Sequence, residues 1–231
     1  MGWTIYSKMA HDYKCDLIEW QQSGYKDTDD VKKFFGILSK ISYMDSKARQ
    51  RLIRDFGAKI GDNLTIINKY TDRDRLAIFN ADCNKVILIF RGTDIKNKTN
   101  NRNRDLIADM WIAAGMTNKS KRYQESKKIL DNIIREYGHD NVILTGHSMG
   151  GKMAYELSKD EKLPAISFNQ FSSPLDFTSN DLNTHFTTND ISKIGQLDPF
   201  SISSTLLDDQ KIIISDVKEG LTPHTIDNFI Y

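Results

Sequence analysis

The segment from Asn141 to Gly151 constrains the fold of this chain most, because an apolar run leads directly into a turn and then into a helix-like sequence. It reads NVILTGHSMGG, so Gly146 and Gly150 stand two residues before and after Ser148. A serine on a tight strand-to-helix turn leaves no room for side chains at those two positions, and glycine meets this demand. The bare pattern arises by chance in roughly one chain in fifteen of this length. Its setting between a strand and a helix predicts a turn that exposes the Ser148 hydroxyl.

Composition predicts one globular domain over residues 1–231. The chain has 39% hydrophobic residues, which is enough for one core. The 32 Lys and Arg nearly balance the 31 Asp and Glu, so no overall field draws the protein to nucleic acid or to an anionic membrane. The longest apolar runs, VILIF and IIIS, are too short to cross a bilayer, so we expect strands there and no transmembrane segment.

The two cysteines bear on the environment of the protein. Cys15 and Cys83 are too few for a disulfide framework, and no disulfide is expected. The N-terminus carries no charged, apolar and small-residue leader. These features predict a cytoplasmic or otherwise non-secreted, reducing location.

Hydrophobic periodicity predicts a helical cap region over residues 1–60 and a core over residues 61–231. Apolar residues recur at helical spacing from Asp30 to Asp55, and the pattern ends near Gly57. Three β-rich runs follow, LTIINKYTD, RLAIFNADC and KVILIFRGT, with turn residues between them, and they predict a meander. Residues 120–138 again have a helical period.

Beyond Ser148 the pattern predicts a helix from Gly151 to Lys159 and then three strands, at AISFNQF, ISKIGQL and KIIIS. A terminal segment with His224 follows. Strands that alternate with helices predict a mostly parallel central sheet with helices on both faces. Together with the turn at Ser148, these elements predict the α/β-hydrolase fold class, in which that turn is the nucleophile elbow.

An elbow serine needs an acid and a histidine later in the chain. His224 follows a predicted strand, so its loop can reach back over the elbow, whereas His185 lies in the polar stretch TSNDLNTHFTTND with no predicted strand to hold it. We therefore prefer His224 as the base, with a surface histidine as the alternative reading. Asp198 directly follows ISKIGQL, at a strand's carboxyl end, where it could orient the imidazole. Asp176, after the preceding strand, is the alternative acid.

The run KVILIFRGTD predicts the second half of such a site. An N–H group in the loop after an early strand must join the N–H of the residue that follows the serine, and together they hold an oxyanion. Gly92 and Thr93 fit that loop position.

In these motifs the chain resembles the class three lipases, a fungal-lipase-like family. The family signatures are an apolar strand that ends in FRG(T/S), a nearby DLxxDL-like stretch, GHSxGG, and a late Asp-Pro followed by His. The matching segments here are Phe90 to Thr93, Asp105 to Met110, Gly146 to Gly151, Asp198-Pro199 and His224. The matching order covers residues 64–230, and the N-terminal third does not carry it.

The resemblance implies that Ser148 is the nucleophile, His224 the general base and acid, and Asp198 its orienter. It implies an oxyanion hole made of the backbone N–H groups of Thr93 and Met149, to which the Thr93 hydroxyl adds a donor. The implied reaction is hydrolysis of an acylglycerol or phospholipid ester through an acyl-enzyme, with no metal and no cofactor. Other motif residues are expected to be structural: His147, Arg91 and Asp109, together with Gly151, which allows close helix packing.

Two departures from the family pattern bear on the substrate. Residues 94–104 are longer and more polar than the usual connection, and Leu106 stands where an aromatic residue is common. Beyond this insertion, LIADMWIAA can present a helical apolar stripe near the site, formed by Leu106, Met110 and Trp111. Four basic residues of the insertion lie either in a solvated loop or at the site mouth, where they would attract anionic lipid: Lys96, Lys98, Arg102 and Arg104.

The expected partners are a lipid or other ester substrate and, peripherally, a lipid surface, with no nucleic acid. Two alternatives stay open. One is an esterase or acyltransferase that acts on small soluble esters with the same elbow. The other is a non-catalytic structural or binding protein that retains the fold.

Overall fold

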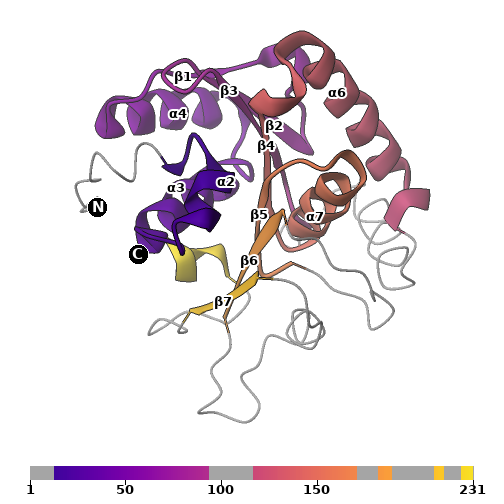
Figure 1. Cartoon of the computed structure of the whole chain (residues 1–231). Helices are drawn as coiled ribbons and strands as arrows, with labels where there is room; N and C mark the ends of the chain where they lie inside the picture. The colour runs from indigo at the N-terminus through magenta and orange to yellow at the C-terminus, as the bar shows by residue number, and fades with distance from the viewer. Residues whose placement is uncertain (1–12, 94–116, 171–181, 189–210, 216–224, 231) are drawn as a thin grey trace.

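The computed structural model describes residues 13–93, 117–170, 182–188, 211–215 and 225–230. Within them, a seven-stranded sheet lies between two helical layers (Figure 1). One layer contains α2 (Leu17–Gln22), α3 (Thr28–Ile41) and α4 (Ser46–Ile60), and the other contains α6 (Lys121–Tyr137) and α7 (Met149–Glu161). A mixed sheet with helices on both faces confirms the predicted α/β-hydrolase fold class.

The strands lie in the sheet in their order along the chain. β1 (Leu64–Ile66), β2 (Arg75–Asn80) and β3 (Lys85–Phe90) pair antiparallel and confirm the predicted meander. From β3 onward every pair is parallel, through β4 (Val142–His147), β5 (Ala165–Phe168), β6 (Asn183–Thr188) and β7 (Lys211–Ser215). Parallel neighbours need crossover connections, and α6 and α7 lie in those that precede and follow β4.

Strand β3 shows why the sheet needs a helical layer on each face. Val86, Leu88 and Phe90 pack with side chains of α6 and α7, whereas Ile87 and Ile89 pack with side chains of α3. All five are buried. Because successive side chains of a strand point to opposite faces, a strand covered on both faces is apolar throughout.

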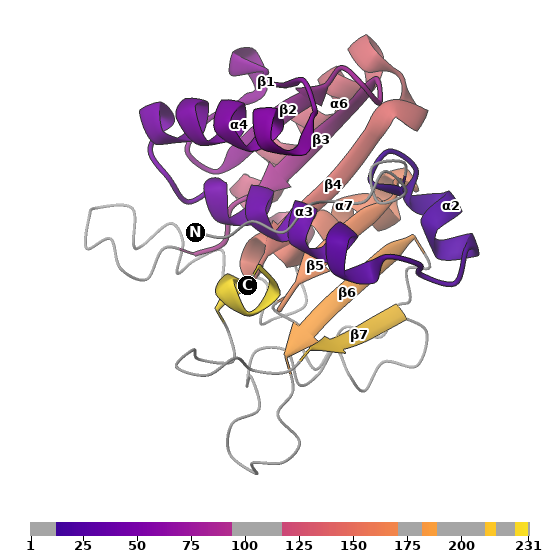
Figure 2. The same cartoon turned by 90° about the vertical axis from the view of Figure 1, so that its left-hand side faces the viewer.

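The predicted helical cap region contains two helices, α3 and α4, in addition to the short α2. Asp45 separates α3 from α4, and its side chain accepts the Ala48 N–H at 2.9 Å as an N-cap. The predicted end near Gly57 is wrong, because α4 continues to Ile60 and ends at Gly61, with φ 75°. Gly57 is a close-packing position instead: a Cβ there would lie 2.7 Å from the Asp62 carbonyl oxygen. Figure 2 shows this layer in front of the sheet.

Strand β6 corrects a second prediction. The polar stretch around His185 was expected to be a loop, but Asn183–Thr188 pairs with β5 on one side and β7 on the other. Polar side chains of this strand form hydrogen bonds inside the sheet, which explains why its sequence lacks the alternating apolar residues that usually indicate a strand. Asn183 Nδ2 and His185 Nδ1 lie 3.1 and 3.0 Å from the buried Ser167 hydroxyl of β5. The predicted strand over residues 191–197 lies outside the described residues.

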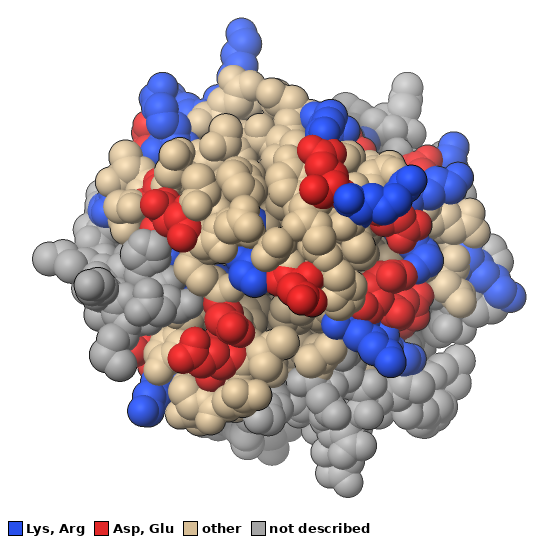
Figure 3. Space-filling model, turned by 45° about the horizontal axis from the view of Figure 1, so that its top comes forward, with Lys and Arg blue, Asp and Glu red and all other residues tan. Residues whose placement is uncertain are grey.

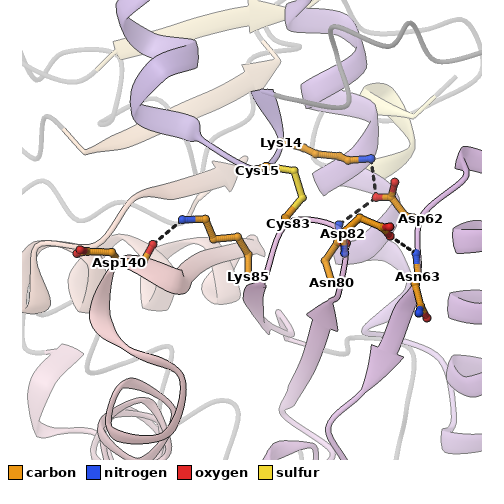
Figure 4. Close-up of a disulfide and its surroundings, with 9 residues drawn as sticks. All are labelled: Lys14, Cys15, Asp62, Asn63, Asn80, Asp82, Cys83, Lys85 and Asp140. Atoms are coloured by element: carbon orange, nitrogen blue, oxygen red, sulfur yellow. Dashed lines mark hydrogen bonds and ion pairs between the residues drawn. A yellow bond between two sulfur atoms is a disulfide. The ribbon is translucent and has the colours of Figure 1, made fainter.

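The expectation of no disulfide is also wrong. Cys15 and Cys83 are bonded to one another and join the segment before α2 to the turn between β2 and β3 (Figure 4). Beside this bond, Lys14 Nζ lies 2.5 Å from the buried carboxylate of Asp62. Asn80 Nδ2 donates to the same carboxylate at 3.0 Å. Because the two cysteines are paired, they no longer support the predicted reducing location.

The outer surface and the helices add two facts. On the face shown in Figure 3, basic and acidic side chains are interspersed, in agreement with the net charge of +1. In the described part of the chain, every helix is too short or too polar to cross a bilayer.

Candidate active site

Ser148 lies in the turn between β4 and α7, at the carboxyl edge of the parallel strands. Its backbone has φ 59° and ψ −127°, a combination that residues other than glycine rarely adopt. The Ser148 N–H donates to the Phe168 carbonyl of β5 at 2.9 Å, which holds the turn against the next strand. This strained strand-to-helix turn is the predicted elbow.

Backbone proximity explains the glycines around Ser148. A Cβ on Gly146 would come within 3 Å of the Gly150 backbone, and one on Gly150 would come within 3 Å of the Phe90 carbonyl. The steric prediction for both glycines is confirmed. A Cβ on Gly151 would lie 3.1 Å from Gln170 Cβ, so this glycine allows α7 to pack closely, as expected.

The loop after β3 lies directly against the elbow. A Cβ on Gly92 would lie 3.1 Å from Ser148 Cβ. The Gly92 N–H donates to the Tyr43 hydroxyl at 3.0 Å, so this N–H already has an acceptor. Thr93 Oγ1 lies 3.7 Å from Met149 Sδ. The fold thus brings together Ser148, Thr93 and Met149.

The start of α7 adds an electrostatic contribution. Met149 is the first residue of this 13-residue helix, and Ser148 occupies the N-cap position. The first N–H groups of a helix have no partner within it and carry partial positive charge. An anion that develops beside Ser148 would be stabilised by that charge.

Two residues that the sequence patterns did not indicate contact the same loop from opposite helical layers. Tyr43, just after α3, places its ring 5.6 Å from the Arg91 guanidinium, and its hydroxyl lies 3.0 Å from His147 Nδ1. Arg122 of α6 is buried, donates to the Arg91 carbonyl, and has Nη1 3.7 Å from Met149 Sδ. Neither residue belongs to a sequence motif. His147 and Arg91 are buried. The contact of His147 with Tyr43 agrees with the structural role expected for it, whereas Asp109, the expected partner of Arg91, lies outside the described residues.

The other predicted site residues lie outside the described residues. They are Asp198 and His224, the alternative acid Asp176, Asp109, the apolar stripe Leu106, Met110 and Trp111, and the basic residues Lys96, Lys98, Arg102 and Arg104. Of the predicted triad, the structure therefore describes Ser148. Over the described ranges, His, Cys, Asp and Glu side chains form no group of three or more that could hold a metal ion.

His185, the alternative base, is buried within the sheet. Its partner in the register is Ser167 on β5, which in turn pairs with Gly146 on β4. Two strand spacings separate His185 from β4, roughly 10 Å, which exceeds hydrogen-bonding reach. Its distance from the elbow, and not the lack of a strand, argues against His185 as the base.

Among solved structures, the chain is similar to a propeptide complex of a Rhizomucor miehei lipase deletion mutant, with 17% identity and a TM-score of 0.39. That match covers 63% of this chain and 52% of the lipase chain, so this chain spans about half the length of that protein. It is also similar to a fungal lipase–inhibitor complex described as a model for interfacial activation, with 17% identity and a TM-score of 0.42. This second match covers 74% of this chain and 75% of the other.

A comparison with curated protein sequences gives no match. A family model for the Tle-like phospholipase domain matches residues 54–176, just over half of the sequence. The matched segment contains Thr93, Ser148 and Met149 and ends before Asp198 and His224. Since this match covers more than half of the sequence and includes the elbow and the loop after β3, the chain belongs to the family with a Tle-like phospholipase domain.

Proposed function

We propose that the protein is a serine ester hydrolase that cleaves carboxylic esters of phospholipids or acylglycerols. The observation that carries this proposal is the strained turn at Ser148, with the Arg91 to Thr93 loop packed against it. Strain of this kind persists where the surrounding structure holds it in place, and it concentrates at functional sites. Membership of a phospholipase-like family supports a lipid ester as the substrate.

In the proposed reaction, the Ser148 hydroxyl attacks the ester carbonyl while His224 accepts its proton. Asp198 orients His224 and stabilises the imidazolium. The backbone N–H groups of Thr93 and Met149 hold the oxyanion of the tetrahedral intermediate. His224 then protonates the leaving alcohol, which leaves the acyl group on Ser148. In the second half of the reaction, water gives a proton to His224 and attacks the acyl carbonyl, and His224 returns that proton to the Ser148 oxygen as the fatty acid leaves.

Replacement of the nucleophile tests this proposal. Because the members of a triad act as a unit, Ser148→Ala should lower turnover of a short ester by about 10⁶-fold. Mass spectrometry after treatment with a fluorophosphonate should place the adduct on Ser148. Ser23→Ala, which removes a hydroxyl that binds the Trp20 carbonyl in another part of the protein, serves as the control. A label on a different serine, with activity intact in Ser148→Ala, would move the site elsewhere.

The acid is tested by two asparagine variants. If Asp198 orients His224, Asp198→Asn favours the wrong imidazole tautomer and should cost about 10⁴-fold in turnover. Asp176→Asn should then have a mild effect. The reverse ranking would assign the acid to Asp176.

Substrate class is tested with the purified protein on esters of increasing acyl length, together with phospholipid and acylglycerol vesicles. A lipid hydrolase should turn over the long-chain lipids faster than the short soluble esters. Faster turnover of the short esters at every concentration would favour a small-ester hydrolase with the same elbow.

A further inference from the structure

We infer that Tyr43 is a positioning residue for the oxyanion hole, and that its hydroxyl holds the backbone of the loop that carries Thr93. The inference rests on the proposed hydrolase function. It assigns a role at the site to the N-terminal helical region, which the motifs leave without one.

The Tyr43 hydroxyl joins the two halves of the site at one oxygen atom. It accepts the Gly92 N–H at 3.0 Å and lies 3.0 Å from His147 Nδ1. A tyrosine hydroxyl has one hydrogen and two acceptor lone pairs, so it can accept from Gly92 and donate to Nδ1 of a neutral histidine. Gly92 immediately precedes Thr93, and His147 immediately precedes Ser148. The hydroxyl therefore sets the spacing between the oxyanion donor and the nucleophile.

Close packing makes this contact specific. A Cβ on Gly92 would come within 3 Å of the Tyr43 hydroxyl oxygen and would lie 2.6 Å from the His147 carbonyl oxygen. Loss of the hydroxyl would leave the Gly92 N–H without this acceptor and open space beside the loop. A shift of the Thr93 N–H by about 1 Å can cost on the order of 10²-fold in rate.

Tyr43 is itself held at its backbone. Its N–H donates to the Lys40 carbonyl at 3.1 Å, which continues the last turn of α3. The buried Arg49 guanidinium donates to the Ser42 carbonyl and, at 2.5 Å, to the Asp72 carbonyl. Burial lowers the pKa of Arg49, and nearby Arg91 lowers it further. The residues around Asp72 thus anchor the peptide next to Tyr43.

The turn that anchors Tyr43 also holds the start of the oxyanion loop. The Arg91 N–H donates to the Asp74 carbonyl at 2.9 Å, and Arg122 holds the Arg91 carbonyl from the other face of the sheet. Arg91 is therefore fixed from two directions before the chain reaches Gly92. The Gly92 N–H donates to the Tyr43 hydroxyl, so removal of that hydroxyl should affect Thr93 more than Arg91.

The test is Tyr43→Phe, which keeps the ring beside Arg91 and His147 and removes only the hydroxyl. With a short soluble ester, kcat should fall by about 10- to 100-fold while KM stays within about twofold, because the lost contact acts in the transition state. The affinity for a boronic acid, which mimics the tetrahedral intermediate, should fall by the same factor as kcat/KM. The affinity for an unreactive ether analogue of the substrate should not change.

Tyr123→Phe is the matched control. The Tyr123 hydroxyl donates to the Asp160 carboxylate and joins α6 to α7 away from the oxyanion loop. This variant should lose stability and keep kcat within about twofold. It therefore shows whether the loss of any partly buried hydroxyl lowers kcat, or only the loss of the hydroxyl that positions the oxyanion loop.

The outcomes distinguish the inference from the function on which it rests. If Tyr43→Phe folds, hydrolyses the ester at the wild-type kcat and binds the boronic acid normally, Tyr43 does not position the site, although the hydrolase function stands. If the wild-type protein neither hydrolyses esters nor takes the fluorophosphonate label, the proposed function fails and the inference with it. Should Tyr43→Phe not fold, replacement of Tyr43 by 4-aminophenylalanine fills the same space with a poor acceptor. An unchanged kcat in that variant would overturn the inference.

Discussion

At the residue scale, the elbow stores conformational strain at Ser148. Its φ of 59° and ψ of −127° suit glycine better than any residue with a Cβ. Such strain costs about 1–3 kcal/mol. Glycine would relieve this strain, but it also loses more conformational entropy on folding than a residue with a Cβ, which offsets part of the gain in stability. We therefore expect Ser148→Gly and Ser148→Ala to be equally inactive, with the glycine variant more stable to urea by about 1 kcal/mol.

The same pair of substitutions at Ser126, inside α6, is the control for that comparison. There glycine should be less stable than alanine by about 1 kcal/mol, since a helix interior disfavours glycine. A glycine variant at Ser148 that unfolds at lower urea than the alanine variant would show that the turn carries no strain.

The glycine at position 150 gives a second prediction at this scale. In Gly150→Ala the new methyl group would meet the Phe90 carbonyl, which the sheet holds in place. We expect urea denaturation to show a loss of at least about 3 kcal/mol, the upper range for overpacking. In Gly36→Ala the methyl group would lie 3.5 Å from Ile230 in an ordinary contact, and stability should hold or rise by up to about 1 kcal/mol. Equal effects of the two changes would contradict the close approach at the elbow.

At the element scale, the disulfide joins the N-terminal helical layer to the sheet. It closes a separation of 68 residues, for which loop-closure entropy predicts a stabilisation of about 4 kcal/mol as an upper estimate. A variant with both Cys15→Ser and Cys83→Ser should unfold at lower urea, and reductant should shift the wild-type transition to match it. Reductant should not affect the double variant. An identical wild-type transition with and without reductant would show that the bond adds nothing to stability.

The junction between η3 (His139–Asn141) and α7 predicts a pH dependence. The hydrogen bond of His139 Nε2 to the Glu161 carbonyl at 2.7 Å raises the pKa of His139, and Asp140, 3.2 Å from Nδ1, raises it further. Protonated His139 therefore stabilises the fold below its ordinary pKa, and this contribution is lost as pH rises through the raised value.

Because His139 and Asp140 are exposed, the pH effect should be at most about half a kcal/mol. His139→Gln should lower the free energy of unfolding more at pH 5.5 than at pH 8.5, measured by urea denaturation at each pH. A larger loss at pH 8.5 would reverse the assigned direction of the pKa shift.

At the scale of the whole molecule, the near-zero net charge leaves attraction to lipid to local groups. If the basic insertion lies at the site mouth, each cation should contribute about 1 kcal/mol toward an anionic surface at low salt. Hydrolysis should then be faster on anionic than on zwitterionic vesicles, and the difference should vanish as salt rises. The four basic residues of the insertion are Lys96, Lys98, Arg102 and Arg104. Their replacement by Gln should remove the difference between the vesicle types and leave turnover of a short soluble ester unchanged.

A second quadruple variant controls for the loss of charge. It replaces four exposed basic residues in and beside α6 by Gln: Lys119, Lys121, Lys128 and Arg135. It should keep the preference for anionic vesicles. If both quadruple variants lose the preference equally, net charge and not the insertion would be responsible. Equal rates of the wild-type protein on both vesicle types would show that the insertion has no role at the lipid surface.

Much of the fold could be predicted because its signals are local. Helical and strand periodicity indicated the meander, α6 and the elbow, and the glycines at 146 and 150 indicated a turn whose backbone contacts the structure confirms. These features depend on residues within a few positions of one another, where sterics and side-chain direction decide the conformation. The loop with Thr93 was also found in this way, since it directly follows an apolar strand.

The remaining features were decided by tertiary contacts. Strand β6 has a polar pattern because its inward side chains bind Ser167 across the sheet. Tyr43 reaches residues 49 and 104 positions further along the chain, and the disulfide joins cysteines 68 positions apart. A polar or thiol group becomes informative only when folding supplies its partner, and no local pattern records which partner that is. The sequence by itself therefore determined the strands and helices around the elbow and the turn at Ser148, whereas the tertiary structure decided which distant side chains hold that turn in place.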